Sequence, residues 1–365
     1  MRVKFYYSAP GWTGGARVFV AAAKGLAARG CQVTFACPGG GAVEARAAAD
    51  GCDVVPIDTG GSLLGRGWRL QRILTERFVE TVFVHSEREQ LDVSIAMRIA
   101  GRGGVVRRVP AGTRPEMGRG TGVALRLATG GFVFTTEAEA EATPKPPLAR
   151  PPVVADLGVD VSRYDELRAV PLAALGARAP DARLIVCAFD AGGKAQAATV
   201  LRTLALLAPR HPELHLAMVG PGSDDQDLRM HSAALGVARR VSFLGERDDD
   251  FAVLQAAHLG WIVASDDAAG FTALDVMSMR IPVLADRDTV AARYVADGIT
   301  GALLNPGDAL GTAAVVAGLL ALDERRHAMG SAGRARVARE YTETAMVDAL
   351  QGAADTARDR TRWAG

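Results

Sequence analysis

Residues 263–285 read VASDDAAGFTALDVMSMRIPVLA, and this stretch decides the fold class of the chain. It begins with an apolar strand-like run, passes through an acidic loop to a glycine that starts a helix over 271–279, and ends in a second strand at Ile281–Leu284. Two short strands joined through a helix are expected to lie parallel, because a helix is the usual crossover connection between two parallel strands. The stretch therefore predicts one β–α–β unit of a parallel sheet.

The same alternation continues in both directions, which predicts an α/β chain with two doubly wound, Rossmann-like domains in tandem and a site in the cleft between them. In the first half the predicted strands are Val3–Ser8, Gln32–Ala36, Asp53–Ile57, Thr81–Val84, Val105–Val109 and Phe132–Thr135, with helices near 14–29, 41–50, 64–78 and 88–101. In the second half the predicted strands are Arg183–Ala188, Leu214–Val219, Val241–Leu244 and Leu259–Ala264, with helices 194–208, 224–236 and 250–257 and a helical tail over 307–360. A proline cluster at 144–152 separates the halves, because proline interrupts helices and central strands.

Length and composition exclude several protein classes. The 365 residues suit two domains, and a hydrophobic content of 49% excludes a disordered chain. No apolar run reaches the roughly 18 residues of a membrane-spanning helix, and Met1–Tyr7 resembles a first strand rather than a secretory leader, so we expect a cytoplasmic protein. Aromatic residues make up only 5% of the chain and no recognised module is present, which argues against a nucleic-acid partner.

The four cysteines do not form a metal-binding or disulfide pattern. Cys31, Cys37, Cys52 and Cys187 include no CxxC pair and lie in or beside apolar runs. Since an unpaired cysteine behaves as a small hydrophobic residue, we expect buried structural thiols.

The net charge of +1 hides an asymmetry between the two halves of the chain. Residues 1–150 hold 20 of the 42 basic and 13 of the 41 acidic residues, a net charge of +7, which leaves −6 for the remainder. The densest basic stretch is Arg98–Arg126, with seven arginines against Glu116 alone. Such a stretch could attract an anionic acceptor or provide peripheral contact with an anionic membrane surface, but an arginine-rich solvated face explains it more simply.

Two short segments after predicted strands are suited to an anionic ligand. Gly14 and Gly15 follow the first strand at the start of a helix, where glycine lets a ligand approach the backbone and helix amides favour an anion. A tight turn would select glycine as well. Lys194 follows the first strand of the second half, where it could neutralise a diphosphate or stand in solvent at the start of a helix.

The stretch that decides the fold also carries candidate ligand contacts. The amides of Gly270, Phe271 and Thr272, at the predicted helix start, would favour a pyrophosphate. Asp267 lies before that helix and could face sugar hydroxyls, and Asp275 could accept hydrogen bonds from a ribose. In the alternative, Asp267 only caps the helix and Asp275 is solvated.

Taken together, these motifs resemble the GT-B fold, in particular the retaining glycosyltransferases of family 4, over nearly the whole chain. The ordered matches are Gly14-Gly15 with its helix, Gly158-Val159-Asp160, Lys194, Val219-Gly220, Phe243-Leu244-Gly245, the 263–285 stretch and the helices after Tyr341. The resemblance implies an acceptor-binding domain at 1–155, a nucleotide-sugar-binding domain at 156–340 and a terminal helix at 341–365 that crosses back to the first domain.

The resemblance also implies site roles. Gly14 and Gly15 approach the donor diphosphate, Lys194 neutralises it and Asp267 contacts the donor sugar. Asp275 binds the ribose, while Gly245, Glu246 and Arg247 line the base pocket. The donor substrate is a nucleotide-diphosphate sugar and the acceptor a glycan, lipid-linked or small-molecule compound, with no metal or other cofactor.

The chain departs from the family pattern at several of these positions. Asp267 and Asp275 replace the two glutamates of Glu-x7-Glu, Phe189 replaces an arginine, and Ala195 follows Lys194 where glycine is usual. The usual histidine after the fifth strand is absent, and His85 follows the fourth. Three interpretations stay open: an active glycosyltransferase, a catalytically degenerate subunit that binds nucleotide or sugar and supports a partner enzyme, and another GT-B enzyme such as an epimerase.

Overall fold

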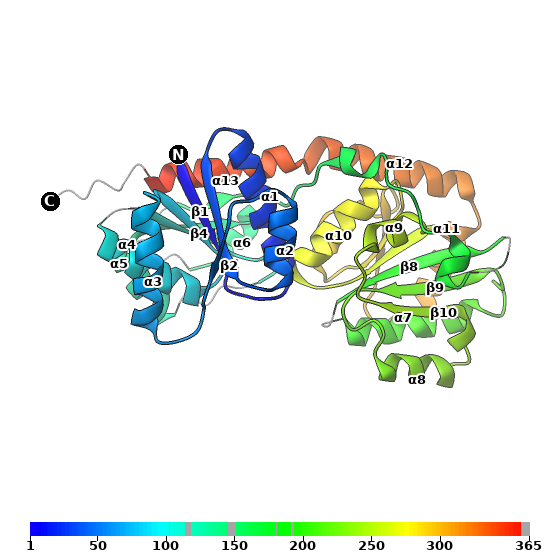
Figure 1. The fold of residues 1–365 in the computed structure, drawn as a ribbon. Coiled ribbons are helices and arrows are strands. Elements are labelled where there is room, and N and C mark those ends of the chain that lie inside the picture. The colour runs from blue at the N-terminus through cyan, green and yellow to red at the C-terminus, as the bar shows by residue number, and fades with distance from the viewer. Residues whose placement is uncertain are drawn as a thin grey trace. The chain divides into compact units, whose positions relative to one another are not determined.

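The computed structural model describes residues 1–101, 103–113, 118–144, 151–177, 179, 181–190 and 193–358, and these form two compact units. Unit 1 comprises residues 1–157 and 343–365, and unit 2 comprises residues 158–342. Each unit is built on one parallel sheet (Figure 1). The prediction of two doubly wound α/β domains is therefore confirmed.

Unit 1 has a seven-stranded parallel sheet of order β3-β2-β1-β4-β5-β6-β7. Its strands are β1 Arg2–Tyr6, β2 Gln32–Pro38, β3 Val54–Ile57, β4 Thr81–Val84, β5 Gly104–Arg108, β6 Thr129–Phe134 and β7 Val153–Val154. Its helices are α1 Gly14–Ala28, α2 Ala42–Ala49, α3 Leu63–Glu76, α4 Glu87–Ala100, α5 Arg119–Leu127, α6 Glu137–Ala142 and α13 Glu343–Arg358. The sequence patterns did not indicate α5, α6 or β7, which are short or lie near the proline cluster.

The register of the central strands builds the core of unit 1. Phe5 on β1 lies opposite Phe35 on β2 and Phe83 on β4, with ring centroids 6.3 and 5.0 Å from that of Phe5. Phe19 of α1 closes this cluster at 5.2 Å from Phe5. Offset aromatic pairs of this kind add to the free energy gained from burying the rings.

Helix α13 completes unit 1 although it is the last helix of the chain. It packs on α1 so closely that a Cβ atom on Gly25 would lie 2.7 Å from Val347 Cγ2. The hydroxyl of Thr81 on β4 donates to the carbonyl of Ala354, 3.2 Å away. Glycine at position 25 thus permits the contact that holds the terminal helix.

Unit 2 has a six-stranded parallel sheet of order β10-β9-β8-β11-β12-β13. Its strands are β8 Arg183–Phe189, β9 Leu214–Val219, β10 Val241–Gly245, β11 Leu259–Val263, β12 Val283–Asp286 and β13 Gly301–Leu304. Its α-helices are α7 Lys194–Leu207, α8 Gln226–Ala234, α9 Asp250–Gln255, α10 Asp266–Ser278, α11 Ala309–Leu320 and α12 Asp323–Glu340. Short 3-10 helices, η1 Val161–Tyr164, η2 Leu172–Leu175, η3 Ala238–Arg240 and η4 Val290–Arg293, lie in the connections. One core joins β8, β9 and β11 to α7 and α11, with Cys187 and Trp261 buried in it.

The cysteines are all unpaired thiols, and Cys37 and Cys187 are buried whereas Cys31 and Cys52 are partly buried. Burial raises the pKa of Cys37 and of Cys52 to about 11. These thiols are therefore protonated and unreactive at neutral pH. In the described part of the chain, no helix combines the length and the apolar character that crossing a bilayer requires.

Lys4 is an ionisable residue on β1, inside the unit 1 sheet. Its side chain is fully buried on β1, and among the described residues its Nζ has no hydrogen-bond partner. Burial, and then the charge of Arg77, lower the pKa of Lys4 from 10.5 to about 7, and Asp53 acts weakly in the opposite direction. The folded chain therefore holds a largely neutral amine near pH 8.

We predict that replacing Lys4 with Met removes a pH dependence of stability. Because the pKa of Lys4 is lower in the folded than in the unfolded chain, unfolding takes up a proton between these two values and wild-type stability rises with pH. Between about pH 7.5 and pH 9.5, the free energy of unfolding of the wild type should rise by about 2 kcal/mol relative to Lys4→Met. Urea unfolding of both proteins at the two pH values measures this difference, and parallel behaviour of the two proteins would exclude it.

Candidate functional site

The candidate site of unit 2 lies at the edge of the sheet where its strands end. Because all six strands are parallel, the turns after β8, β9, β10 and β11 come together at one edge, which is where open α/β sheets bind ligands. Lys194 follows β8, Gly245 ends β10 with Glu246 and Arg247 after it, and Asp267 follows β11. Ala191 and Gly192, in the turn before Lys194, lie outside the described residues.

Two glycines allow these turns to pack against the strand ends. A Cβ atom on Gly193 would lie 2.4 Å from the carbonyl oxygen of Val263, and one on Gly220 would lie 2.1 Å from that of Phe189. Gly220 also has a φ of +116°, which side-chain-bearing residues rarely adopt. Its amide donates to the carbonyl of Gly245 at 2.9 Å, which ties the β9 turn to the end of β10.

Lys194 is the first residue of α7 and forms an ion pair. Its Nζ lies 2.6 Å from Oδ2 of Asp225, and its side chain is 53% exposed. The hydrogen bond to Asp225 raises the pKa of Lys194, so the ammonium stays charged. Asp225 also caps α8 by accepting from the amide of Asp227 at 2.8 Å. An anion beside Lys194 would share this ammonium with a fixed carboxylate.

Acidic residues gather where β11 meets α10. Asp190 Oδ2 accepts hydrogen bonds from the amide and the hydroxyl of Ser265, at 2.6 and 2.7 Å. Asp266 begins α10 with a φ of +49°, and Asp267 beside it is buried. Burial, and then the charges of Asp267 and Asp190, raise the pKa of Asp266. Within the described residues, no group of three or more His, Cys, Asp or Glu side chains is arranged to hold a metal ion.

Helix α10 begins earlier than the sequence pattern indicated. It starts at Asp266, so Asp266 and Asp267 occupy its first turn rather than a loop. Gly270, Phe271 and Thr272 lie a turn inside the helix, where each amide donates to the carbonyl four residues earlier. The prediction that these three amides are available to a pyrophosphate is therefore wrong. Acidic residues are favoured in a first helical turn, and this preference places the start at Asp266.

Asp275 points into the interior of unit 2. It is 2% exposed, and the hydroxyl of Tyr164, at the end of η1, donates to its Oδ1. The ring of Phe251 stands edge-on to that of Tyr164, with centroids 5.8 Å apart. The interpretation of Asp275 as a solvated surface residue is wrong, because its carboxylate is buried.

The turn after β10 holds the residues that were expected to line a base pocket. Gly245 has a φ of +67°, a backbone conformation that suits glycine. Arg247 forms two hydrogen bonds with the carboxylate of Asp249, at 2.6 and 2.7 Å, and Glu246 is exposed. The guanidinium of Arg247 is thus oriented by its own loop.

In unit 1, Gly14 and Gly15 form the start of α1, and both are buried. The N-cap is Thr13, whose hydroxyl accepts from the amide of Ala16. A Cβ atom on Gly15 would lie 2.3 Å from Cε1 of His85, so the close approach that requires glycine is made by the imidazole. The ring of His85 also lies against Tyr7, at 5.5 Å between centroids.

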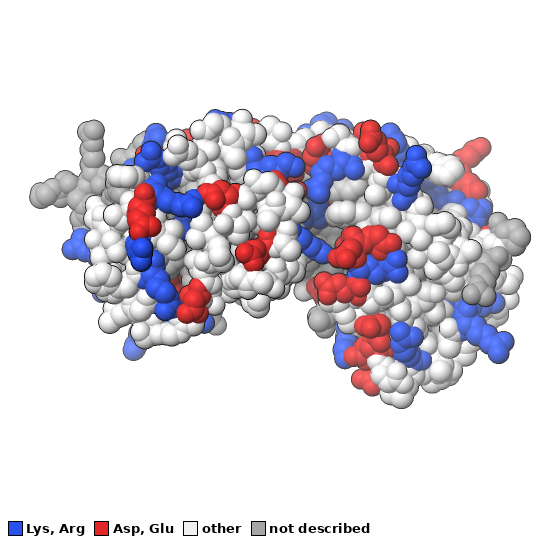
Figure 2. Space-filling view, viewed as in Figure 1, with Lys and Arg blue, Asp and Glu red and all other residues white. Residues whose placement is uncertain are grey.

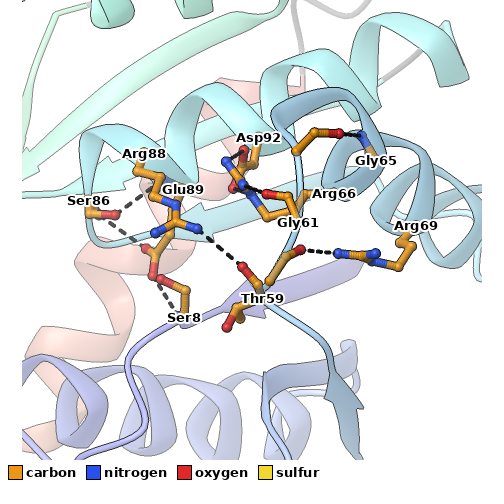
Figure 3. Close-up of polar contacts among 12 residues, drawn as sticks. Ser8, Thr59, Gly61, Gly65, Arg66, Arg69, Ser86, Arg88, Glu89 and Asp92 are labelled. Carbon is orange, nitrogen blue, oxygen red and sulfur yellow. Dashed lines mark hydrogen bonds and ion pairs between the residues drawn. The ribbon is translucent and has the colours of Figure 1, made fainter.

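Glu89 organises this end of unit 1 (Figure 3). Its carboxylate is buried and accepts from the amides of Ser8 and His85, both at 2.6 Å, and from that of Ser86 at 3.1 Å. Burial raises the pKa of Glu89, and the bonds from the three backbone amides act in the opposite direction. The carboxylate therefore joins the turn after β1 to the turn after β4 and fixes the backbone that carries His85.

Sequence patterns did not identify Glu89 or Tyr164 as parts of these sites. The spacing Ser86-x-x-Glu89 is that of a capping box and places Glu89 in the first turn of α4, but it does not indicate the bond to Ser8, 81 residues away. No local signal connects Tyr164 with Asp275, which lies 111 residues later.

Comparison with known proteins agrees with this architecture. The family described as "Glycosyl transferases group 1" matches residues 179–336. The lipopolysaccharide core biosynthesis glycosyltransferase LpsE of Rhizobium meliloti is 26% identical over 147 residues, which are 40% of this chain and 43% of LpsE. The chain thus matches less than half the length of this curated relative.

Solved structures resemble the whole chain. A glycosyltransferase from Rickettsia africae has a TM-score of 0.83 at 14% identity and covers 98% of this chain and 99% of its own. HepE of Anabaena, solved in complex with UDP and glucose, has a TM-score of 0.77 at 18% identity and covers 96% of this chain and 98% of its own. At these identities the likeness shows the fold, which is GT-B.

We predict that Glu89→Gln destabilises unit 1. A glutamine has one acceptor oxygen and turns an NH2 group toward amides that need an acceptor, so the free energy of unfolding should fall by about 2–3 kcal/mol. Glu137→Gln provides the control, because Glu137 is an exposed residue in the first turn of α6. Chemical denaturation measures both variants, and an equal effect of the two would contradict the role assigned to Glu89.

Proposed function

We propose that this chain, which has the GT-B fold and matches the glycosyl transferases group 1 family over residues 179–336, is a retaining glycosyltransferase. Unit 2 binds a nucleotide-diphosphate sugar as donor, and unit 1 binds the acceptor. The observation that supports this proposal is the edge of unit 2, where Lys194 at the start of α7 and Asp267 in the first turn of α10 follow neighbouring parallel strands, β8 and β11. HepE, a relative in fold, was solved with UDP and glucose, which supports a nucleotide sugar as the donor class.

Each site residue has a proposed role. Lys194 neutralises the donor diphosphate, Asp267 contacts hydroxyls of the donor sugar, and Asp275 binds the ribose. Gly245, Glu246 and Arg247 line the base pocket, and in unit 1 the backbone at Gly14 and Gly15 lets an anionic ligand approach. The proposal includes no metal, and Lys194 supplies the positive charge beside the diphosphate.

The proposed transfer needs no covalent intermediate with the protein. As the bond between the sugar and the diphosphate breaks, the acceptor hydroxyl attacks from the same face and passes its proton to the leaving diphosphate. The chain contributes position and charge: it holds the donor in one geometry and stabilises the negative charge that develops on the diphosphate.

The acceptor class follows from charge and relatives. LpsE is a lipopolysaccharide core biosynthesis enzyme. In the Arg98–Arg126 stretch Arg98, Arg119 and Arg126 are exposed, whereas Arg107 and Arg108 are buried in β5 and Arg102 and Arg114 lie outside the described residues, so the expected basic surface is smaller than the sequence indicated. We propose a glycan, lipid-linked or small-molecule acceptor, with peripheral contact between this stretch and an anionic membrane surface.

We predict that Asp275→Ala weakens binding of the nucleotide sugar by about 1–3 kcal/mol, because the variant removes a buried acceptor for ribose hydroxyls. Tyr164→Phe keeps the carboxylate and should have a smaller effect. Glu324→Ala, at an exposed position on α12, should have none. Calorimetric titration of the folded variants gives the dissociation constants, and wild-type affinity of Asp275→Ala would exclude the ribose role.

We also predict that Lys194→Met lowers kcat by about 100-fold, the size of effect seen when one preorganised donor to a developing negative charge is lost. Lys194→Arg keeps the positive charge and should retain most of the activity. The rate of nucleoside diphosphate release with an acceptor present measures turnover, and NMR of the product's anomeric proton tests retention. Unchanged turnover of Lys194→Met would contradict the role of Lys194 and favour a different phosphate partner, whereas absence of turnover in the wild type would favour the degenerate-subunit interpretation.

A further inference from the structure

Helix α3 of unit 1 buries Leu70 and Leu74 as a surface helix normally does, but its first two turns bury an arginine and expose two large apolar side chains. Arg66 is buried and forms a bidentate ion pair with buried Asp92 of α4, at 2.8 and 3.0 Å. Leu64 and Trp68 are 67% and 64% exposed. A helix adapted only to water would bury the leucine and the tryptophan and expose the arginine.

The ion pair fixes which side of α3 faces outward. Successive residues of an α-helix are rotated by about 100°, so Arg66 lies about 200° around the helix from Leu64 and from Trp68. Leu64 and Trp68 are four residues apart and therefore lie on the same side of the helix, about one turn from each other. With Arg66 held inward by Asp92, these two side chains face away from unit 1, and Leu63 beside them is also exposed.

The start of α3 is held in one conformation by arginine side chains (Figure 3). Arg66 donates to the carbonyl of Gly61 at 2.6 Å, Arg69 to that of Gly60, and Arg88 of α4 to that of Thr59 at 3.2 Å. The hydroxyl of Ser62 caps the helix by accepting from the amide of Gly65. The exposed leucine and tryptophan are thus presented on a fixed element.

The surface around them is basic. Helices α3, α4 and α5 form one layer of unit 1, and Figure 2 shows basic side chains with a few acidic ones between them on the side that carries α3 and α4. Among the described residues of 58–127, two acidic side chains are fully exposed, Asp58 and Glu76, and both pair with arginines of α3. Seven arginines in the same range are exposed: Arg69, Arg72, Arg77, Arg88, Arg98, Arg119 and Arg126.

We propose that the exposed face of α3, formed by Leu63, Leu64 and Trp68, is a docking surface that inserts into the headgroup region of an anionic lipid membrane. Apolar and aromatic side chains on one side of a helix with arginines around them are typical of an interfacial helix, since tryptophan prefers the boundary between water and hydrocarbon. The arginines bind the anionic headgroups and the apolar face enters the boundary.

The charge of the surface favours lipid over a second copy of this chain. A symmetric dimer through α3 would place arginines against the same arginines of the partner, because such an interface pairs a surface with itself. An anionic membrane meets the same arginines with opposite charge. The inference extends the proposed membrane contact of Arg98–Arg126 to α3 and does not depend on the transfer reaction.

Sedimentation of the full chain with lipid vesicles tests the proposal. The wild type should bind vesicles of phosphatidylcholine mixed with phosphatidylglycerol, and binding should weaken as salt is raised. The double variant Leu64→Ser/Trp68→Ser should bind them about tenfold more weakly. The matched control is Leu310→Ser/Leu322→Ser, which changes two exposed leucines of unit 2 and should bind as the wild type does.

Tryptophan fluorescence provides a second readout. Vesicles should shift the emission of the wild type to shorter wavelength, and Trp68→Phe should keep vesicle binding but lose most of this shift. Absence of wild-type binding to the anionic vesicles, or equal binding by the two double variants, would overturn the proposal. Self-association in gel filtration that Leu64→Ser/Trp68→Ser abolishes would also overturn it, in favour of a second copy. Nucleotide-sugar affinity should be unchanged in both double variants, which separates this proposal from that of donor binding.

Discussion

The close packing of strand ends in unit 2 is the constraint on which its candidate site depends. The carbonyl oxygens of Val263 and Phe189 lie so near Gly193 and Gly220 that neither position has room for a Cβ atom. These contacts fix Gly193 at the start of α7, and with it the position of Lys194, and they fix the turn after β9. The hydrogen bonds from Ser265 to Asp190 fix the turn after β11 in the same way. A ligand at this edge therefore meets a backbone that is already ordered, so little conformational entropy is lost on binding.

The electrostatics of this edge distinguish the chain from the family pattern it resembles. Phe189 stands where an arginine is usual, Lys194 is paired with Asp225, and Asp190, Asp266 and Asp267 lie together. A diphosphate donor brings negative charge to this environment. Its binding then depends on how far Lys194 exchanges Asp225 for phosphate. Lys194 alone would then neutralise the diphosphate, because Phe189 stands at the position of the second cation in the family pattern.

Much of the fold could be predicted from the sequence, because strand and helix periodicities alternate with little interruption. Two parallel sheets follow from that alternation, and the comparisons agree on GT-B. Helix α10 starts at Asp266, five residues before the predicted start at 271, because acidic residues are favoured in a first helical turn. β13 and α5 lack a strong pattern of their own.

Contacts between residues far apart in the chain could not be predicted from local patterns. Neither the bond between Tyr164 and Asp275 nor that between Glu89 and Ser8 leaves a signal in sequence spacing. The buried pair of Arg66 and Asp92, 26 residues apart, likewise leaves no signal in sequence spacing.

The central claim is that unit 2 holds a working site for a nucleotide-diphosphate sugar. The most direct test is the melting temperature of the purified chain with UDP, GDP, ADP, TDP and their common sugar conjugates. Ligand at about 100 times its dissociation constant adds about 2.7 kcal/mol to the stability of the state that binds it, which for a domain of this size is a shift of several degrees. The account predicts such a shift with the diphosphate and sugar conjugates of one base. A cooperative melt that none of these compounds changes would contradict it.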